Sequence, residues 1–365
     1  MGPSVKLHKT LVGRGAASNP SPRFERFQAS LDPTDDYFEP QDLKTETHYF
    51  HDRTRSLITY NDSPDIGFRA SANPYRGCEH GCAYCYARPT HEYLGFSAGL
   101  DFESRILVKL EAPELLRREL SAKGWQPQPV AFSGVTDIYQ PVERRLELTR
   151  RCLEVFLEFR NPVALITKNY LVTRDLDLLR ELAQFQGVAV TLSLTTLDEE
   201  LRRVMEPRTS SPKRRLQAVE LLAKAGVPVG VLNAPIIPGL TDREIPALVQ
   251  AAADAGASWV GYNILHLPYG LKDLFVDWLQ RHFPDRANKV LGRIRDVRGG
   301  QLNDPRFGYR MVGEGPYAEQ IRALHRSACR RAGLPRARPQ LSTEHFRVPG
   351  QAVQPGLFDP DPRVR

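Results

Sequence analysis

Residues 73–89 read Asn-Pro-Tyr-Arg-Gly-Cys-Glu-His-Gly-Cys-Ala-Tyr-Cys-Tyr-Ala-Arg-Pro. Three of the five cysteines of the chain fall in this stretch, with the spacing Cys78-x3-Cys82-x2-Cys85. Gly77 and Gly81 stand directly before two of these cysteines and let the backbone turn tightly there. Soft sulfur ligands on so short a loop select zinc, copper or an iron–sulfur cluster. The stretch therefore predicts a metal site.

Two kinds of metal site fit the spacing. A structural zinc ion takes four protein ligands, and His80 or His91 could supply the fourth. A zinc ribbon would need a second cysteine pair, whereas the two remaining cysteines, Cys152 and Cys329, stand alone. No fourth cysteine has the spacing of a ferredoxin. A [4Fe–4S] cluster on three thiolates would leave one iron open to a substrate or cofactor.

Composition and charge limit the class of protein. Lys and Arg number 50 against 43 Asp and Glu, a formal net charge of +7. This excess suits a nucleic-acid partner, and it also suits an ordinary solvated surface. No apolar run of about 18 residues predicts a membrane span, and the first residues lack the apolar core of a secretory signal. With few cysteines outside the loop, no disulfide framework is expected, and the sequence predicts a cytoplasmic protein.

Short apolar runs alternate with amphipathic segments after the cysteine loop. This alternation predicts βαβ units and a parallel sheet of about six strands. The expected strands are 70–75, 129–133, 162–168, 188–194, 227–236 and 257–265. The expected helices are 112–123, 143–159, 176–185, 211–225 and 242–255, followed by 270–283, 285–297 and 319–332.

The composition also predicts an order of segments along the chain. Residues 1–40 lack apolar periodicity and are expected to be mostly disordered. Residues 41–69 are expected to form an N-terminal cover, and residues 70–270 the core barrel. A helical extension is expected over residues 271–334, and a flexible tail rich in Pro, Arg and Gln over residues 335–365.

The cysteine loop, with Tyr84 directly before the third cysteine, resembles the cluster loop of the radical S-adenosylmethionine (radical SAM) superfamily. The resemblance implies an α/β fold built as a partial TIM barrel of the (β/α)6 type. More narrowly, residues 78–86 resemble the branch that contains spore photoproduct lyase and DNA repair photolyase-like proteins. What the superfamily implies here is a [4Fe–4S] cluster on Cys78, Cys82 and Cys85, with S-adenosylmethionine at the open iron. Cleavage of that cofactor would give a 5′-deoxyadenosyl radical, with the electron supplied by a reductant such as flavodoxin or ferredoxin.

The same resemblance assigns roles to residues at the carboxyl ends of the strands, where parallel barrels place their sites. Glu206 is expected to hold Arg208 against the cofactor. Tyr84 and Tyr86 match the two loop tyrosines of the lyase branch and are the expected catalytic residues. The expected cofactor-binding residues are Tyr84, Ser133, Gly134, Thr136, Lys168, Ser193 and Arg208.

One difference between this sequence and the lyase branch concerns the reaction. Spore photoproduct lyase has a hydrogen-donor cysteine near the end of its second strand, whereas residues 132–134 here read Phe-Ser-Gly. The substrate is therefore not identified by the resemblance, and DNA repair does not carry over directly. Nucleic acid stays a candidate because arginines gather near the C-terminal end, at positions 322, 326, 330, 331, 336 and 338.

Two further hypotheses come from other classes of protein. The first is a non-catalytic nucleic-acid-binding protein stabilised by zinc or by an iron–sulfur cluster. The second is an iron–sulfur protein that only transfers electrons. A protein that only binds nucleic acid would not need polar side chains around a barrel mouth. Binding of S-adenosylmethionine at an open iron, seen as a changed EPR signal, would exclude a protein that only transfers electrons.

Overall fold

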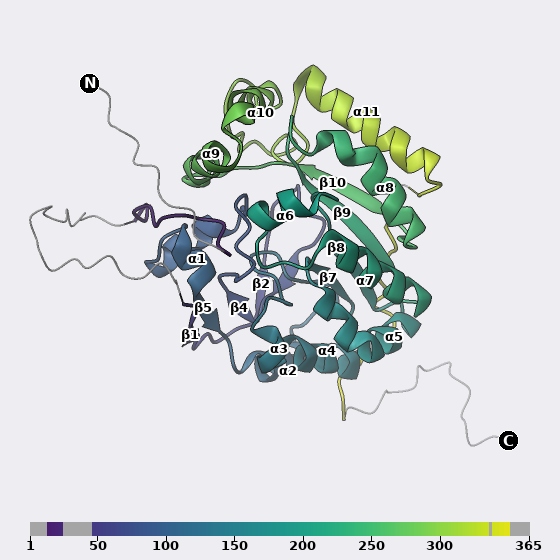
Figure 1. Cartoon of the computed structure of the whole chain (residues 1–365). Coiled ribbons are helices and arrows are strands. Elements are labelled where there is room, and N and C mark those ends of the chain that lie inside the picture. Colours follow the sequence, from purple (N-terminus) through teal and green to yellow (C-terminus); the bar gives the residue numbers. More distant parts are fainter. Residues whose placement is uncertain (1–12, 25–45, 336–337, 351–365) are drawn as a thin grey trace, which may run out of the picture.

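A single sheet of seven strands forms the centre of the molecule (Figure 1). The computed structural model describes residues 13–24, 46–335 and 338–350. The strand order is β10-β9-β8-β7-β6-β3-β2. The strands are β2 (Ile58–Tyr60), β3 (Ala70–Ala72), β6 (Val130–Phe132), β7 (Val163–Thr167), β8 (Val188–Ser193), β9 (Val229–Ile236) and β10 (Val260–Ile264).

Six of these strands are parallel, and only β2 runs antiparallel to its neighbour β3. The six parallel strands are those predicted from the apolar runs. All six residues of β8 are buried, as expected for a strand with helices and barrel interior on its two faces. The sheet does not close, because β2 and β10 stand at its two ends. The predicted partial barrel is confirmed.

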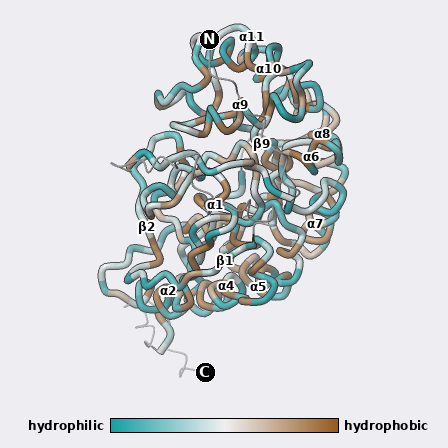
Figure 2. Tube along the Cα trace, turned by 60° about the vertical axis from the view of Figure 1, so that its left-hand side comes forward, coloured by the Kyte–Doolittle hydropathy of each residue, from teal (hydrophilic) through white to brown (hydrophobic). Residues whose placement is uncertain are grey.

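Amphipathic helices cover the outside of the sheet. Hydrophobic and hydrophilic residues alternate along their traces (Figure 2). Buried apolar residues of these helices and of the strands belong to one hydrophobic cluster. The covering helices are α2 (Ala112–Leu120), α3 (Glu143–Leu146), α4 (Leu148–Phe159), α5 (Leu176–Gln184), α7 (Pro212–Lys224) and α8 (Ile245–Asp254). The helix predicted over 143–159 is interrupted, because Glu147 has a φ of 52° and ends α3 before α4 begins.

Short elements lie around the cysteine loop. A second, three-stranded sheet has the order β1-β5-β4. Its strands are β1 (His48–His51), β4 (Tyr75–Arg76) and β5 (Arg105–Val108). The remaining short helices are η1 (Arg88–Leu94), α1 (Leu100–Ser104), η2 (Tyr170–Asp175), α6 (Glu199–Met205) and η3 (Asp242–Glu244).

The C-terminal extension contains α9 (Leu271–His282), α10 (Pro284–Asp296) and α11 (Gly315–Arg331). Helices α9 and α10 share one apolar cluster with Cys82 and Tyr84 of the cysteine loop. Trp278 of α9 donates to the Val204 carbonyl of α6 at 2.9 Å, and the Met205 carbonyl accepts from the Ala83 N–H of the loop at 2.9 Å, so that α6 links the extension to the predicted metal site. Among the described residues, no helix is long and apolar enough to cross a lipid bilayer.

A polar bridge joins the two ends of the open sheet. Asp65, in the loop after β2, accepts hydrogen bonds from the Gly308 backbone N–H at 2.7 Å and from Arg310 at 2.6 Å. One residue further, the Met311 carbonyl accepts from the Ile264 N–H of β10 at 2.8 Å. The segment around Arg310 thus spans the gap between β2 and β10.

The ends of the chain are described only in part. Most of the predicted disordered segment 1–40 lies outside the described residues, but residues 13–24 pack against the cysteine-loop region. In the tail, Phe346 packs beside Phe159 and the Arg347 N–H donates to the Phe159 carbonyl at 2.9 Å. Of the C-terminal arginines, Arg336 lies outside the described residues.

Candidate active site

The cysteine loop is fixed by side chains that follow β6. Gly77 and Gly81 have φ values of +80° and +64°, a backbone conformation that favours glycine. The Thr136 hydroxyl donates to the Gly77 carbonyl at 2.6 Å. Gln140 donates to the same carbonyl at 3.4 Å and accepts from the Glu79 N–H at 2.9 Å. The start of the loop is therefore clamped to the end of β6.

A buried carboxylate holds the loop from its other side. Glu103 of α1 accepts from the backbone N–H groups of Gly15 and Ala16 at 3.1 and 2.8 Å and from Arg88 at 2.8 Å. Arg88 also donates to the Cys82 carbonyl at 3.0 Å. A Cβ on Gly81 would stand 2.3 Å from a Glu103 carboxylate oxygen, so that this position requires glycine for space as well as for its φ.

The three thiols suit an iron–sulfur cluster by their chemistry and placement. Cys78 and Cys82 are buried and Cys85 is half-buried, and all three are free of disulfides. Burial raises the pKa of each thiol, and the neighbouring loop cysteines raise the pKa of Cys78 and Cys82 further. The thiols are therefore protonated without metal, and iron binding must displace their protons. In a [4Fe–4S] cluster each thiolate binds an iron of its own.

The two histidines considered as a fourth zinc ligand make other contacts. His80 is buried between Asp137, at 3.2 Å, and the Asn169 amide, at 3.3 Å. His91 has one ring nitrogen 2.9 Å from the Arg105 carbonyl, and its ring packs edge-on against Phe102. Over the ranges 13–24, 46–335 and 338–350, no three Cys, His or acidic side chains converge as ligands of a single ion do.

The turn after β6 has an unusual backbone. Ser133 has a φ of 142° and Gly134 a φ of 120°, so a non-glycine residue occupies a region that favours glycine. Such a residue stores about 1–3 kcal/mol of strain and is typical of functional sites. The Ser133 hydroxyl donates to the Thr136 carbonyl at 2.8 Å, and the hydroxyl of Tyr86 donates to the Gly134 carbonyl. Tyr86 is 55% exposed and lies at this edge of the mouth.

Asp137 links the ends of β6 and β7. Its carboxylate accepts from the Thr167 hydroxyl at 2.7 Å and from the Lys168 backbone N–H at 2.8 Å. Burial alone would raise the pKa of Asp137, but His80 and these hydrogen bonds outweigh it and lower the pKa. The ionised carboxylate therefore sets the direction in which the chain leaves β7, and so places the Lys168 side chain.

Lys168 and Ser193 come together across β7, β8 and β9. The Lys168 ammonium donates to the Ser193 hydroxyl at 2.5 Å and lies 3.4 Å from the Ala234 carbonyl at the end of β9. It also lies 5.6 Å from the centre of the Tyr84 ring. Two of the predicted cofactor-binding residues thus share one polar cluster with the tyrosine of the cysteine loop.

Glu206 is the carboxylate of this cluster. It is fully buried and pairs with Arg215, with Lys168 at 3.4 Å, and with the hydroxyls of Tyr84 and Thr195. Burial alone would raise its pKa, but the charges of Arg215 and Lys168 outweigh this and hold the pKa well below its ordinary value. The carboxylate is therefore ionised, and it ties the loop to strands β7 and β8.

Arg208 lies away from this carboxylate. Its guanidinium pairs with Glu79 at 3.4 Å and lies 3.3 Å from the Thr47 hydroxyl, on the outer side of the cysteine loop. The expected support of Arg208 by Glu206 is therefore wrong, because Arg215 on α7 reaches Glu206 from inside the fold. Arg208 itself remains a predicted cofactor contact.

Several residues that build the site were missed by the sequence analysis. Gln140, Glu103 and Arg215 clamp the loop or the buried carboxylate, yet they lie on three different helices or turns. Arg215 had one indirect signal, since an arginine at an apolar position of an amphipathic helix needs a buried partner. Thr195 could have been found by its place directly after the predicted strand 188–194.

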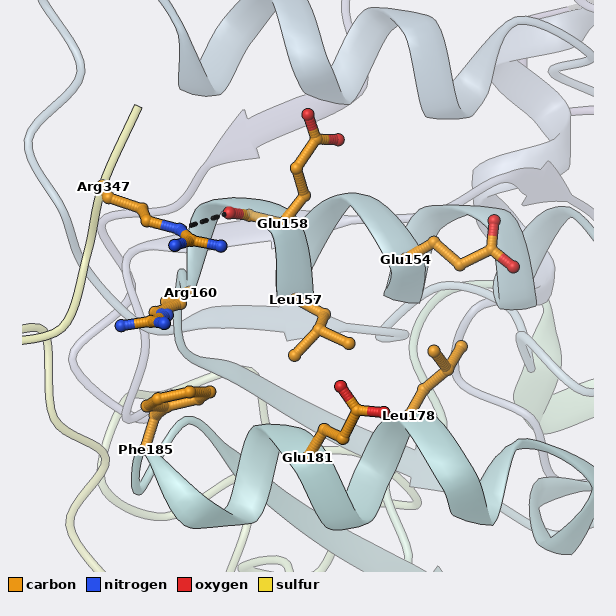
Figure 3. A pocket seen from close by; sticks show the side chains of 8 residues that line it. All are labelled: Glu154, Leu157, Glu158, Arg160, Leu178, Glu181, Phe185 and Arg347. Atoms are coloured by element: carbon orange, nitrogen blue, oxygen red, sulfur yellow. Dashed lines mark hydrogen bonds between the residues drawn. The ribbon is translucent and has the colours of Figure 1, made fainter. Parts of the chain in front are cut away.

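A cavity at the opposite end of the barrel is separate from this site. It has a volume of about 310 Å³ and lies between the C-terminal halves of α4 and α5 and the described tail (Figure 3). Arg347 reaches across it and donates to the Glu158 carbonyl at 3.1 Å. Since Arg160 and Phe185 precede the starts of β7 and β8, the cavity lies at the amino ends of the strands.

Comparisons with known proteins agree with this geometry. A family model described as the Radical SAM superfamily matches residues 72–252. An uncharacterized protein of Mycobacterium tuberculosis is 38% identical over 245 residues, which make up 66% of this chain and 71% of that protein. An uncharacterized protein of Methanocaldococcus jannaschii is 31% identical, over 49% of this chain and 64% of that protein. The Radical SAM Nalpha-GlyT isomerase of Pseudomonas phage M6 is 23% identical, over 72% of this chain and 51% of that protein.

Solved structures with a similar fold include variants of spore photoproduct lyase. One of them, with bound AdoMet and dinucleoside spore photoproduct, has a TM-score of 0.54 and 18% identity, over 78% of each chain. A second variant has a TM-score of 0.53 over the same shares. At this identity the likeness shows a common fold.

Proposed function

The chain belongs to the radical SAM superfamily, and from this membership we propose how its own residues carry out the superfamily's chemistry. The membership makes it an enzyme that cleaves S-adenosylmethionine at a [4Fe–4S] cluster. When bound, these two cofactors supply a 5′-deoxyadenosyl radical that removes a hydrogen atom from a substrate. The observation that supports the proposal is the meeting of the cysteine loop with the Lys168–Ser193–Glu206 cluster at Tyr84.

The thiolates of Cys78, Cys82 and Cys85 hold the cluster. The clamps from Thr136, Gln140 and Glu103 shape the loop before any iron arrives, because they join protein groups only. The apolar packing of α9 and α10 against the loop excludes water from one side of it. A site closed in this way protects a reactive radical from side reactions.

The residues at the ends of β6, β7 and β8 orient S-adenosylmethionine. Lys168 offers its ammonium to the carboxylate of the methionine moiety, and Ser193 a hydroxyl to the polar part of the cofactor. Ser133, Gly134 and Thr136 follow β6, where the backbone is strained. Glu206 lies behind Lys168 and holds the ammonium in place. Tyr84 acts here as a positioning residue, since its hydroxyl is buried against Glu206 and Thr195.

Tyr86 is the catalytic residue that faces the substrate. No cysteine stands at the end of β6, and the Tyr86 hydroxyl contacts the backbone of that same turn. A tyrosine hydroxyl can donate a hydrogen atom, which is the role that a cysteine at this place has in the lyase. The reaction is therefore proposed to differ from photoproduct repair in its hydrogen donor, with a low-potential flavodoxin or ferredoxin as the electron source.

Anaerobic reconstitution tests the core of the proposal. The wild-type protein should bind about four irons per chain and, with dithionite and S-adenosylmethionine, release 5′-deoxyadenosine. The triple variant Cys78→Ala, Cys82→Ala, Cys85→Ala should do neither, whereas Cys329→Ser on α11 should match the wild type. A colourless protein with one bound zinc and no 5′-deoxyadenosine would contradict the proposal.

Lys168→Ala tests the assignment of the cofactor site. Loss of one charge-assisted hydrogen bond should weaken the binding of S-adenosylmethionine about tenfold or more, with the iron content unchanged. The matched control is Lys224→Ala on α7, since that side chain is 71% exposed and, among the described residues, forms an ion pair only with Glu220. The affinity for S-adenosylmethionine is measured by equilibrium dialysis on reconstituted protein. Equal affinities of the two variants would show that Lys168 does not bind this cofactor.

A further inference from the structure

A basic groove lies between α10, α11 and the turn that follows β9. Its volume is about 490 Å³. The lining residues are Gly239, Leu240, Asp242, Arg243, Arg286, Lys289, Arg293, Tyr317, Gln320, Ile321 and Leu324. This volume falls within the range of small-molecule sites, about 300–1,000 Å³.

Two helix faces give the groove its shape. Arg286, Lys289 and Arg293 are three and four residues apart on α10, so that their side chains project from one face. On α11, Tyr317, Ile321 and Leu324 have the same spacing and form an opposing wall. The Arg293 guanidinium lies 4.5 Å from the centre of the Tyr317 ring and connects the two walls.

The charge of the groove is strongly positive. Its lining contains four cationic side chains and a single carboxylate, that of Asp242. The Asp242 oxygens are already engaged by the N–H groups of Gly239 and Arg243, each at 3.0 Å, and by the Tyr317 hydroxyl. Arg293 pairs with Asp296 at 3.2 Å.

The other three cations lack such partners. Within the part of the chain that the structure describes, Arg243, Arg286 and Lys289 have no carboxylate within 4.0 Å. Leu324, which is 36% exposed, adds an apolar surface from α11 to one side, with Leu240 and Ile321 buried beneath the lining. A ligand that fits must therefore have several negative charges and an apolar part, which describes a phosphorylated ring compound.

We propose that this groove binds the phosphate groups of a free nucleotide. Arg243, Arg286 and Lys289 contact the phosphates, and the ring rests on the apolar wall of α11. The site is distinct from the radical site, because it lies outside the sheet, between two helices of the C-terminal extension. It is joined to the radical site through β9, because the turn after this strand lines the groove and the Ala234 carbonyl within the strand accepts from Lys168 and Ser193.

The test is calorimetric titration of reconstituted protein with ADP. Saturating S-adenosylmethionine is present, so that adenosine binding in the radical site does not contribute. ADP should bind with a dissociation constant below about 1 mM, and adenosine, which lacks phosphates, should not bind. The double variant Arg286→Glu, Lys289→Glu should weaken ADP binding about tenfold for each contact.

A control variant carries the same change of charge elsewhere. Lys272→Glu, Arg295→Glu alters two exposed positions of α9 and α10 that do not line the groove, and it should bind ADP like the wild type. Absent binding of ADP, or equal weakening in both double variants, would overturn the proposal. Groove-dependent binding of a single strand of about 12 nucleotides without binding of ADP would also overturn it in favour of a polynucleotide. Formation of 5′-deoxyadenosine by the groove variant reports on the radical site separately.

Discussion

At the scale of single residues, Glu206 controls the charge of the site. Its buried carboxylate faces the buried guanidinium of Arg215, so each group depends on the other for its stability in the interior. Removing one partner of a buried ion pair leaves an uncompensated charge. Glu206→Ala should therefore lower the free energy of unfolding by about 3–5 kcal/mol.

Urea denaturation of the two proteins measures this difference. Glu200→Ala is the control, because Glu200 is 82% exposed and its pair with Arg203 should contribute less than about 1 kcal/mol. If Glu206→Ala and Glu200→Ala have the same effect, the buried cluster does not stabilise the fold.

The same carboxylate predicts a dependence of stability on pH. In the folded protein, the pKa of Glu206 is held well below its unfolded value near 4.5. The stabilisation is therefore complete above the unfolded pKa and is lost as the pH falls toward the folded pKa. Between pH 7 and pH 4, the wild type should lose more stability than Glu206→Gln, which cannot ionise. If the urea midpoints of the two proteins changed equally with pH over this range, the low pKa assigned to Glu206 would be contradicted.

At the scale of elements, the shape of the cysteine loop depends on the lack of a side chain at Gly81, which lies against Glu103. Gly81→Ala would place a methyl group 2.3 Å from the Glu103 carboxylate and would strain a φ of +64°. The loop must shift, so the reconstituted variant should bind clearly less iron than the wild type. Gly95→Ala is the matched control, because Gly95 also has a positive φ, +74°, but a Cβ there would meet no atom of the described residues within 4 Å.

Iron content and the visible absorption of the cluster distinguish these variants. Gly95→Ala should retain four irons and lose only about 1 kcal/mol of stability from the positive φ. If Gly81→Ala also retains its iron, the contact between the loop and Glu103 does not shape the metal site.

The elements themselves were largely predictable from local sequence. Apart from Ser193, the run 188–194 is apolar or β-branched, which is the pattern of a buried parallel strand. The break at Glu147 was not predictable, because glutamate is a good helix former and seldom adopts a φ of 52°. The features least predictable from the sequence were the pairings between buried polar side chains. Arg208 follows Glu206 closely in sequence, yet Arg215 reaches it in space, and sequence spacing alone does not distinguish the two.

At the scale of the whole molecule, the polar bridge holds together a barrel whose sheet is open. Asp65 and Arg310 join segments 245 residues apart, and both side chains are largely buried. Asp65→Arg and Arg310→Asp should each destabilise the protein, whereas the double variant should recover part of the loss. A double-mutant cycle from urea denaturation should give a coupling energy of about 1 kcal/mol.

A coupling energy of zero would mean that the pair of Asp65 and Arg310 does not hold β2 and β10 together and that other contacts do. The control pair is Arg117 and Glu158, which are exposed and link α2 to α4 without spanning the gap. Their coupling should be smaller, because both side chains remain hydrated.

The clamps on the cysteine loop affect how the protein recovers after oxygen has damaged its cluster. Thr136, Gln140 and Glu103 keep the loop in shape through protein groups alone, so loss of iron should not unfold it. A molecule that has lost its cluster to oxygen would then keep a folded cysteine loop. It could bind a new cluster without synthesis of a new protein chain. Repeated cycles of air exposure and anaerobic repair should accordingly return most of the activity each time.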